Sequence, residues 1–218
     1  MILRLENVSK AYLQGTKKIE VLNALNMEVK EGEIVSIVGQ SGCGKSTLLS
    51  LISGLDTPDS GKVILNGKDL SLLSETEVTR LRGESLGIVF QQFHLIPHLS
   101  AWENVHLPLE ILGAPNEKKA SEMLAKVGLS RRGDHFPDQL SGGECQRVAI
   151  ARAMIADPSL ILADEPSGNL DATTSDQVMG VLFDMVKSEK CTMVLVTHNE
   201  KLAAVCQRQL TLKNGVLV

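Results

Sequence analysis

The sequence is poor in aromatic residues and contains no block of basic residues. Aromatic side chains make up only 3% of the 218 residues, and the formal net charge is −4. Proteins that bind nucleic acids use basic surfaces and aromatic platforms on which bases stack. We therefore expect no nucleic-acid partner.

Long apolar runs, a secretion signal and metal-type cysteine motifs are also absent. The longest apolar runs, such as 86–90 and 194–197, are strand-sized and far below the ~18 residues that span a bilayer. The first ten residues lack the basic start and apolar stretch of a signal peptide. The scattered cysteines predict free thiols in a reducing cytosol: Cys43, Cys145, Cys191 and Cys206.

Apolar residues, 43% of the chain, follow strand and helix patterns in turn. Residues 2–7 and 21–30 alternate between apolar and polar, which predicts an antiparallel pair at the N-terminus. Continuous apolar runs predict strands buried on both faces: 34–39, 86–90, 159–165 and 191–198. With helical patterns between these runs, the chain is predicted to be α/β, with a mostly parallel sheet and helices on both faces.

The stretch from about Gln91 to Pro158 has no strand pattern. Helical patterns fill it at 100–112, 116–129 and 141–156. We therefore predict one domain, 1–218, in which residues 1–90 and 158–218 form a core with an N-terminal antiparallel β subdomain. Residues 91–157 would form a helical subdomain inserted into that core.

Residues 39–46, "GQSGCGKS", match the phosphate-loop pattern G-x-x-x-x-G-K-[ST]. A predicted strand precedes the loop and a predicted helix follows it, which disfavours an ordinary glycine-rich turn. Gly39 and Gly44 allow backbone N–H groups to converge on phosphate oxygens, Lys45 adds a cation, and Ser46 offers a hydroxyl to Mg²⁺. Cys43 could be a redox switch, but a small side chain in a tight loop is the favoured interpretation.

Polar residues also end three of the buried strands. Asp164 can reach a Mg²⁺ shell, and Glu165 can orient an attacking water or accept its proton. Gln91 ends another strand. His198 would be a capping residue, a satisfied core residue or a contact to the γ-phosphate. In α/β sheets such strand ends meet at the ligand-binding edge. Tyr12 could stack on an adenine, and the residues alone leave this open.

A second glycine-rich segment, "LSGGECQR" at 140–147, has the pattern of a helix start with Ser141 as the N-cap. A helix N-terminus is an anion site, yet the phosphate loop already serves the chain's own nucleotide. A second anion site is useful if it meets the nucleotide held by another copy. We therefore expect two chains to close around ATP, head to tail, about a two-fold axis.

These motifs, in this order and spacing, resemble the ATP-binding-cassette ATPases of membrane transporters over nearly the whole chain. The resemblance implies ATP and Mg²⁺ as cofactors. It implies a phosphate site made by the loop 39–47, including Ser41, Gly42, Cys43 and Thr47, with Tyr12 stacked on adenine. It implies that Gln91 senses Mg²⁺ and the membrane subunit.

The same resemblance assigns the remaining residues. It implies Ser141, Gly143 and Glu144 as the signature that acts on the partner's nucleotide, and Asp171 as an acid that crosses the dimer. It implies Glu165 as the catalytic base and His198 as the γ-phosphate switch. Cys145, where a longer polar or basic residue is expected, and Ser167, where threonine is usual, depart from the family pattern.

Within the family, "FQQFHLIPHLSAWENV", "ADEPSGNLD" and "RQLTLKNGVL" resemble the lipoprotein-releasing (LolD-like) branch. This branch implies transmembrane permease subunits as partners, at the cytoplasmic face of the inner membrane. MacB-like exporters and FtsE-like cell-division ATPases belong to the same branch and remain alternatives. A non-transport cassette ATPase is disfavoured because the chain has one cassette and no heptad insertion. A small-molecule kinase would leave "LSGGECQR" without a role.

Overall fold

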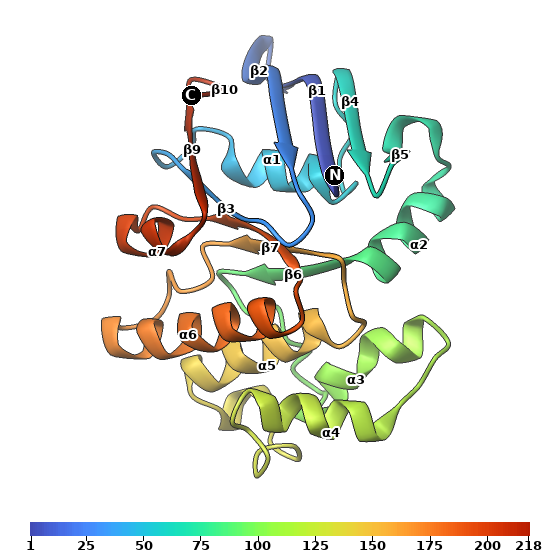
Figure 1. The fold of residues 1–218 in the computed structure, drawn as a ribbon, viewed down its shortest axis with the longest axis vertical. Coiled ribbons are helices and arrows are strands. Elements are labelled where there is room, and N and C mark those ends of the chain that lie inside the picture. The colour runs from blue at the N-terminus through green and yellow to red at the C-terminus, as the bar shows by residue number, and fades with distance from the viewer. The chain divides into compact units, whose positions relative to one another are not determined.

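The computed structural model describes all residues from Met1 to Val218. Two compact units share the chain. The first unit comprises Met1–Arg82 and Thr192–Val218, and the second comprises Gly83–Cys191. Figure 1 labels the elements of both units.

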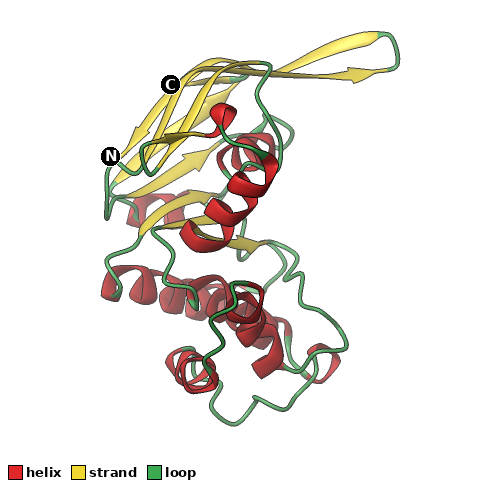
Figure 2. Cartoon of the chain, turned by 90° about the vertical axis from the view of Figure 1, so that its right-hand side faces the viewer, coloured by secondary structure: helices red, strands yellow, loops and turns green.

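An antiparallel sheet opens the first unit. β1 (Leu3–Gln14) pairs with β2 (Lys17–Val29) on one side and with β4 (Ser60–Leu65) on the other, and β5 (Lys68–Asp69) pairs with β4. The predicted antiparallel pair is confirmed, but both strands are longer than the alternating segments indicated. Beyond the core, the hairpin of β1 and β2 continues as an exposed ribbon, where buried and exposed residues no longer alternate. It is the long yellow pair of strands in Figure 2.

The first unit also contains a mostly parallel set of strands, ordered β10-β9-β3-β8. β3 (Ile34–Val38) runs parallel to β8 (Thr192–Val196) and β9 (Arg208–Lys213), and β10 (Val216–Leu217) returns antiparallel to β9. The apolar runs of β3 and β8 are almost wholly buried, as continuous apolar strands require. The helical segments of this unit are α1 (Lys45–Ile52), η1 (Leu70–Leu72) and α7 (Glu200–Val205).

The second unit is built on a parallel pair of strands and a group of helices. β6 (Leu86–Phe90) and β7 (Leu160–Asp164) pair in register from Leu86↔Leu160 to Phe90↔Asp164. The helical segments are α3 (Ala101–Ile111), α4 (Glu117–Lys126), η2 (Pro137–Gln139), α5 (Gly142–Met154) and α6 (Ala172–Ser188). α2 (Glu75–Ser85) carries the chain from the first unit into the second.

α5 is the central helix of the second unit and contacts α3, α4, α6 and β6. Its approach to β6 is so close that a Cβ on Gly87 would lie 2.1 Å from the Ala153 carbonyl oxygen. The strand therefore needs glycine at that position. On α6 the buried face includes Met179, Leu182 and Phe183, whereas Val181 is only half-buried.

No strand lies between Gln91 and Pro158, which confirms the helical character predicted for this stretch. The second compact unit contains these helices together with β6, β7 and α6. The boundaries at 91 and 157 remain a prediction. α7, six residues capped by the side chain of Asn199, was not predicted because it is too short to show helical periodicity. No helix has the length and apolar composition needed to cross a bilayer.

Candidate functional site

The phosphate loop joins β3 to α1 in the first unit, as predicted. The Lys45 ammonium is buried and donates hydrogen bonds to the carbonyl oxygens of Gly39, at 2.9 Å, and Gln40, at 3.0 Å. No side chain caps the N-terminus of α1, and no acidic residue lies in its first turn. The loop thus combines a cation with an uncapped helix start that has no acid in its first turn, which is the chemistry of an anion site.

Two glycines of this loop are required by packing as well as by any ligand. A Cβ on Gly39 would lie 2.5 Å from the Leu212 carbonyl oxygen. Gly44 has a φ of +105°, and its Cβ would lie 2.9 Å from a Val21 methyl group. Gly42 has a φ of +78° with no atom close by, so its backbone conformation alone favours glycine. Cys43 is half-buried within the loop, and Ser41 and Ser46 are exposed.

Tyr12 lies on the hairpin of the first unit, and its phenol is fixed by hydrogen bonds. The Tyr12 hydroxyl donates to Asp56 Oδ2 at 2.7 Å, and Lys10 Nζ donates to Asp56 Oδ1 at 2.7 Å. Burial and the bond to Asp56 raise the pKa of Tyr12. Sequence reasoning missed Lys10 and Asp56. The available signal was Lys10 itself, a lysine at an inward position of a strand whose other inward residues are apolar.

His198 follows β8 in the same unit and is exposed. The sequence left open whether it is a capping residue, a satisfied core residue or a phosphate contact, and its exposure excludes the core residue. The N-cap of α7 is Asn199, whose Oδ1 accepts from the N–H groups of Lys201 and Leu202. His198 is therefore not the capping residue.

In the second unit, Asp164 and Glu165 follow the buried strand β7, and both are half-buried. Glu165 has a φ of +45°, in the left-handed region that costs a non-glycine residue roughly 1–2 kcal/mol. Its carbonyl oxygen accepts from Gly168 N at 2.9 Å. The turn that follows β7 therefore begins at Glu165. Strained residues of this kind cluster at functional sites.

Gln91 lies beside the loop that follows β7, because β6 and β7 end in register. Gln91 Nε2 donates to Asn169 Oδ1, and Asn169 Nδ2 donates to the Gln91 carbonyl oxygen, both at 3.1 Å. A Cβ on Gly168 would lie 2.8 Å from Gln91 Nε2. The structure thus brings the predicted Gln91 to the turn that starts at Glu165.

The backbone after Gln91 is held by side chains that sequence reasoning did not single out. Gln146 Nε2 donates to the Phe90 carbonyl oxygen at 3.1 Å. The Arg152 guanidinium donates to the carbonyl oxygens of Phe93, at 2.9 Å, and His94, at 2.6 Å. Burial lowers the pKa of Arg152. Both side chains come from α5, so the helix of the second glycine-rich segment also anchors the Gln91 loop.

Ser141 is the N-cap of α5, which confirms the predicted helix start. Its hydroxyl accepts from Glu144 N at 3.2 Å, and Glu144 Oε2 accepts from Ser141 N at 2.8 Å, which completes a capping box. Arg132 Nε donates to Glu144 Oε1 at 3.0 Å. Hydrogen bonding from the Ser141 N–H is the main cause that lowers the pKa of Glu144.

Gly143 is buried because α5 approaches α6 at this point. A Cβ on Gly143 would lie 2.4 Å from Thr174 Cγ2. Asp171 is the N-cap of α6, and its Oδ1 accepts from Thr174 N at 3.1 Å. Cys145 is buried, and its thiol donates to the Pro137 carbonyl oxygen at 3.4 Å. Burial raises the pKa of Cys145, so this thiol is poorly suited to reactivity.

The predicted site residues therefore fall into two sets, one in each unit. Tyr12, the loop 39–47 and His198 belong to the first unit, whereas Gln91, Asp164, Glu165, the signature segment and Asp171 belong to the second. An α/β chain with a phosphate loop and a second glycine-led helix of this kind is an ATP-binding cassette.

Comparison with known proteins gives the same class. Residues 22–168 match the family model described as ABC transporter, and the chain belongs to this family. Similar curated proteins include the lipoprotein-releasing system ATP-binding protein LolD of Shewanella frigidimarina, 46% identical over 99% of this chain and 92% of the relative. LolD of Hahella chejuensis is 46% identical over 99% of this chain and 95% of its own length.

Solved structures agree with the fold. The ATP-binding cassette MJ0796, described as a dimer in a post-hydrolysis state bound to ADP and Pi, has a TM-score of 0.91 and 43% identity. That match covers 99% of this chain and 96% of the other chain. A second dimeric structure of MJ0796 has a TM-score of 0.91 and 42% identity, with the same coverage. The predicted fold class is confirmed, and the chain is an ABC ATPase that binds and hydrolyses ATP.

Proposed function

We propose that this chain is the ATPase subunit of a transporter that releases lipoproteins from the inner membrane. The supporting observation is 46% identity with LolD proteins over 99% of the chain. In this proposal the chain lies at the cytoplasmic face of the inner membrane, bound to transmembrane permease subunits rather than to lipid.

The phosphate loop would hold the triphosphate of ATP. Lys45 would exchange its bonds to the Gly39 and Gln40 carbonyl oxygens for β- and γ-phosphate oxygens, which are stronger, charged acceptors. The backbone N–H groups at the start of α1 would contact the same phosphates. The loop residues Ser41, Gly42, Cys43, Gly44 and Thr47 would line this site.

Magnesium fits the donor groups that the proposal assigns to it. Ser46 offers a hydroxyl, Asp164 a carboxylate at a strand end and Gln91 an amide oxygen, and all three are hard oxygen donors. Magnesium is usually held by one or two carboxylates together with phosphates and waters, so a protein cage of many acids is not needed. When bound, the ion would neutralise charge on the phosphates.

Glu165 would be the general base. Its backbone turns at the end of β7, directly after Asp164, and in this proposal Asp164 would serve the metal while Glu165 would hold the attacking water. Glu165 would accept the proton of this water as the oxygen attacks the γ-phosphorus. His198, exposed after β8, would contact the γ-phosphate.

Two chains would close around two ATP molecules, head to tail. Ser141 uses its hydroxyl oxygen to accept from Glu144 N, which leaves the O–H group to donate to a phosphate of the partner's ATP. Gly143 would keep the backbone near that phosphate, and Glu144 would hold the serine. Asp171 would lie across the dimer from its counterpart.

The segment after Gln91 would contact the permease. Its apolar side chains are carried on a backbone that Arg152 and Gln146 anchor to α5. Movement of the signature helix on ATP binding would therefore move this segment as well. ATP can drive such a change only by binding the closed state more tightly than the open one.

Lipoprotein release gives this coupling a physical purpose, because withdrawing acyl chains from a bilayer costs roughly 0.8 kcal/mol per CH₂. The test is depletion of the chain in its own cell, with rescue by the parent or by Glu165→Gln. We expect lipoproteins to accumulate in the inner membrane unless the parent chain is restored. If lipoproteins are still delivered while export of a drug or peptide is lost, the MacB-like alternative replaces this proposal. A division defect alone would favour the FtsE-like alternative.

A further inference from the structure

We propose that Lys10 and Asp56 are positioning residues that fix Tyr12 as a platform for the nucleobase. The inference deepens the proposed function, because it rests on the proposed contact between Tyr12 and adenine. It adds that base recognition depends on a part-buried ion pair in the first unit. This pair lies outside the glycine-rich motifs.

Asp56 connects three groups through one carboxylate. One oxygen, Oδ1, accepts from Lys10 Nζ at 2.7 Å and from Thr57 N at 2.7 Å, while Oδ2 accepts from the Tyr12 hydroxyl at 2.7 Å. Burial opposes ionisation of Asp56, but the hydrogen bonds from Lys10, Tyr12 and Thr57 prevail and lower its pKa. The bond to Asp56 raises the pKa of Lys10. Both members of the pair are therefore charged at neutral pH.

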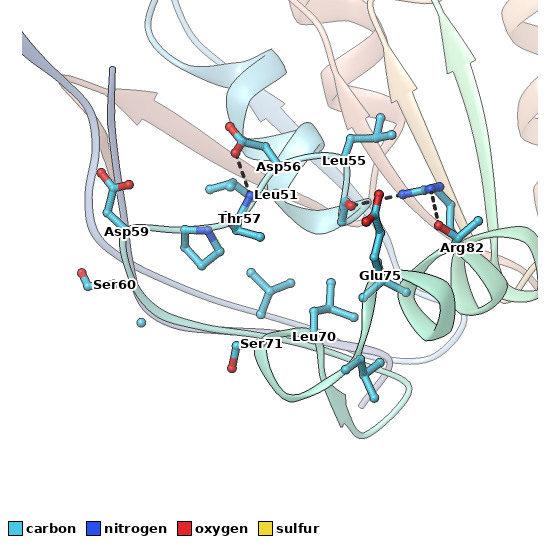
Figure 3. A pocket seen from close by; sticks show the side chains of 17 residues that line it. Leu51, Leu55, Asp56, Thr57, Asp59, Ser60, Leu70, Ser71, Glu75 and Arg82 are labelled. Carbon is cyan, nitrogen blue, oxygen red and sulfur yellow. Dashed lines mark hydrogen bonds between the residues drawn. The ribbon is translucent and has the colours of Figure 1, made fainter. Parts of the chain in front are cut away.

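The loop that carries Asp56 is attached to β1 by polar bonds. Lys10 Nζ also donates to the Thr57 carbonyl oxygen at 2.7 Å, and Asp59 Oδ2 accepts from Ala11 N at 2.8 Å. On another side this loop borders a cavity of about 710 Å³, where Figure 3 shows Asp56 with its bond to Thr57. Since side-chain packing does not fill that side, the position of the Asp56 carboxylate depends on its polar bonds, of which the ion pair with Lys10 is one.

The tyrosine ring is supported by a cation and still accessible. Lys10 Nζ lies over the ring at 5.2 Å from its centroid, and Tyr12 keeps 42% of its surface exposed. Lys10 as a whole is only 9% exposed, so the cation interacts with the ring in a largely desolvated environment. A cation that draws electron density from one side of a ring favours stacking of an electron-rich base on its free surface.

Anchoring matters because Tyr12 lies on an exposed hairpin. A free side chain there would lose rotamer freedom when a base binds, whereas a ring that is already held loses little. Tyr12 and the phosphate loop belong to the same compact unit, so the base platform and the phosphate site are parts of one packed body.

The test separates the base from the phosphates. ADP and pyrophosphate are titrated calorimetrically into the parent chain and into Asp56→Asn, Tyr12→Phe and Tyr12→Leu. Tyr12→Phe removes only the anchoring hydroxyl. We expect all three changes to weaken ADP binding about two- to tenfold, the range for one aromatic stack, and to leave pyrophosphate binding unchanged. The matched control is Lys62→Met, which removes a lysine whose partner Asp69 is 3.9 Å away in the same sheet.

The outcomes distinguish the two levels of the proposal. If Tyr12→Leu leaves the ADP affinity unchanged, the adenine contact itself is wrong and the platform with it. If Tyr12→Leu weakens ADP binding but Asp56→Asn and Tyr12→Phe do not, only the positioning role is wrong. A parallel loss of ADP and pyrophosphate binding in Asp56→Asn would show general damage to the unit and would also overturn the inference.

Discussion

The two glycine-rich loops of this chain both lead into helices, yet the helix starts differ. α1 begins at Lys45 with no side-chain cap and no acid in its first turn. α5 begins with a complete capping box in which Ser141 and Glu144 satisfy each other's backbone N–H groups. The first loop is thus open to a strongly charged ligand, whereas the second already contains a carboxylate.

This difference indicates how each loop can bind a nucleotide. The first loop supplies a lysine and the uncapped positive end of a helix dipole. It therefore needs no other chain to attract a phosphate. The second loop offers chiefly the hydroxyl hydrogen of Ser141, because its capping partner Glu144 is negative. The second loop is therefore suited to complete a nucleotide site in which the first loop of the other chain already balances the charge of the phosphates.

The largest effect should come from Glu165→Gln. Loss of the general base should lower ATP hydrolysis by about 10²–10⁴-fold while ATP binding is retained. With ATP no longer consumed, the second loop can remain in contact with the partner's nucleotide, and light scattering should detect a dimer that depends on ATP. Hydrolysis at the parent rate would exclude Glu165 as the base.

Mixing two inactive variants should show that the second loop acts on the other chain. Lys45→Ala disables the first loop and Ser141→Arg the second. A mixed head-to-tail dimer has one site with both changes and one with neither. An equal mixture should recover about a quarter of the parent ATPase rate if the sites act independently. If native mass spectrometry confirms mixed dimers but no ATPase activity returns, a head-to-tail dimer with independently acting sites is excluded.

Gly143→Ala should destabilise the fold through a steric clash at the second loop. The new Cβ would lie 2.4 Å from Thr174 Cγ2, and overpacking of this kind costs about 1–3 kcal/mol in the free energy of unfolding. Adding Thr174→Ser removes the clashing methyl group and should restore much of the loss. Gly180→Ala, on the open face of α6 with no atom within 4 Å, is the control and should not destabilise. Equal losses in Gly143→Ala with and without Thr174→Ser would disprove the steric cause.

Glu144→Gln should have the smallest effect, and this effect should depend on pH. The folded chain lowers the pKa of Glu144, so its stabilisation is present above the unfolded pKa and is lost as the pH falls through the folded value. At pH 7 the change should cost about 0.5–1 kcal/mol, and the difference from the parent should shrink in acid. Urea unfolding at several pH values measures the difference in the free energy of unfolding between the parent and Glu144→Gln.

Glu103→Gln provides the comparison for that experiment, because Ser100 and Glu103 form the same capping box at the start of α3. Glu144 has an additional partner in Arg132, 3.0 Å away. We therefore expect Glu144→Gln to lower the free energy of unfolding more than Glu103→Gln does. A pH-independent cost at Glu144 would show that its charge does not stabilise the helix.

Much of the fold followed from local patterns. The buried strands β3, β6, β7 and β8 are continuous apolar runs, and the N-caps of α3 and α5 are serines followed three residues later by glutamate. Patterns of this kind are set by neighbours in sequence, so they can be read directly. The short helix α7 and the exposed ends of β1 and β2 were not predicted, since none of these segments shows a repeating pattern of apolar residues.

The candidate site was predictable where one segment supplies both the conformation and the chemistry. The phosphate loop, the carboxylates after β7 and the cap at Ser141 are of this type. The anchors of the Gln91 loop were not predictable, because Arg152 and Gln146 act on backbone carbonyls more than fifty residues away in sequence. A polar residue on an amphipathic helix gives no sign of which distant carbonyl it will meet.

The order of the elements and the phosphate and signature segments follow from local sequence, because backbone conformation at glycines, caps and apolar runs depends on adjacent residues. Three relations come from long-range packing instead: Thr174 requires glycine at 143, Asn169 holds Gln91, and Asp56 joins Lys10 to Tyr12. These relations arise when segments far apart in the chain pack to within hydrogen-bond or van der Waals distance. Such distances are a property of the folded chain and not of any one segment.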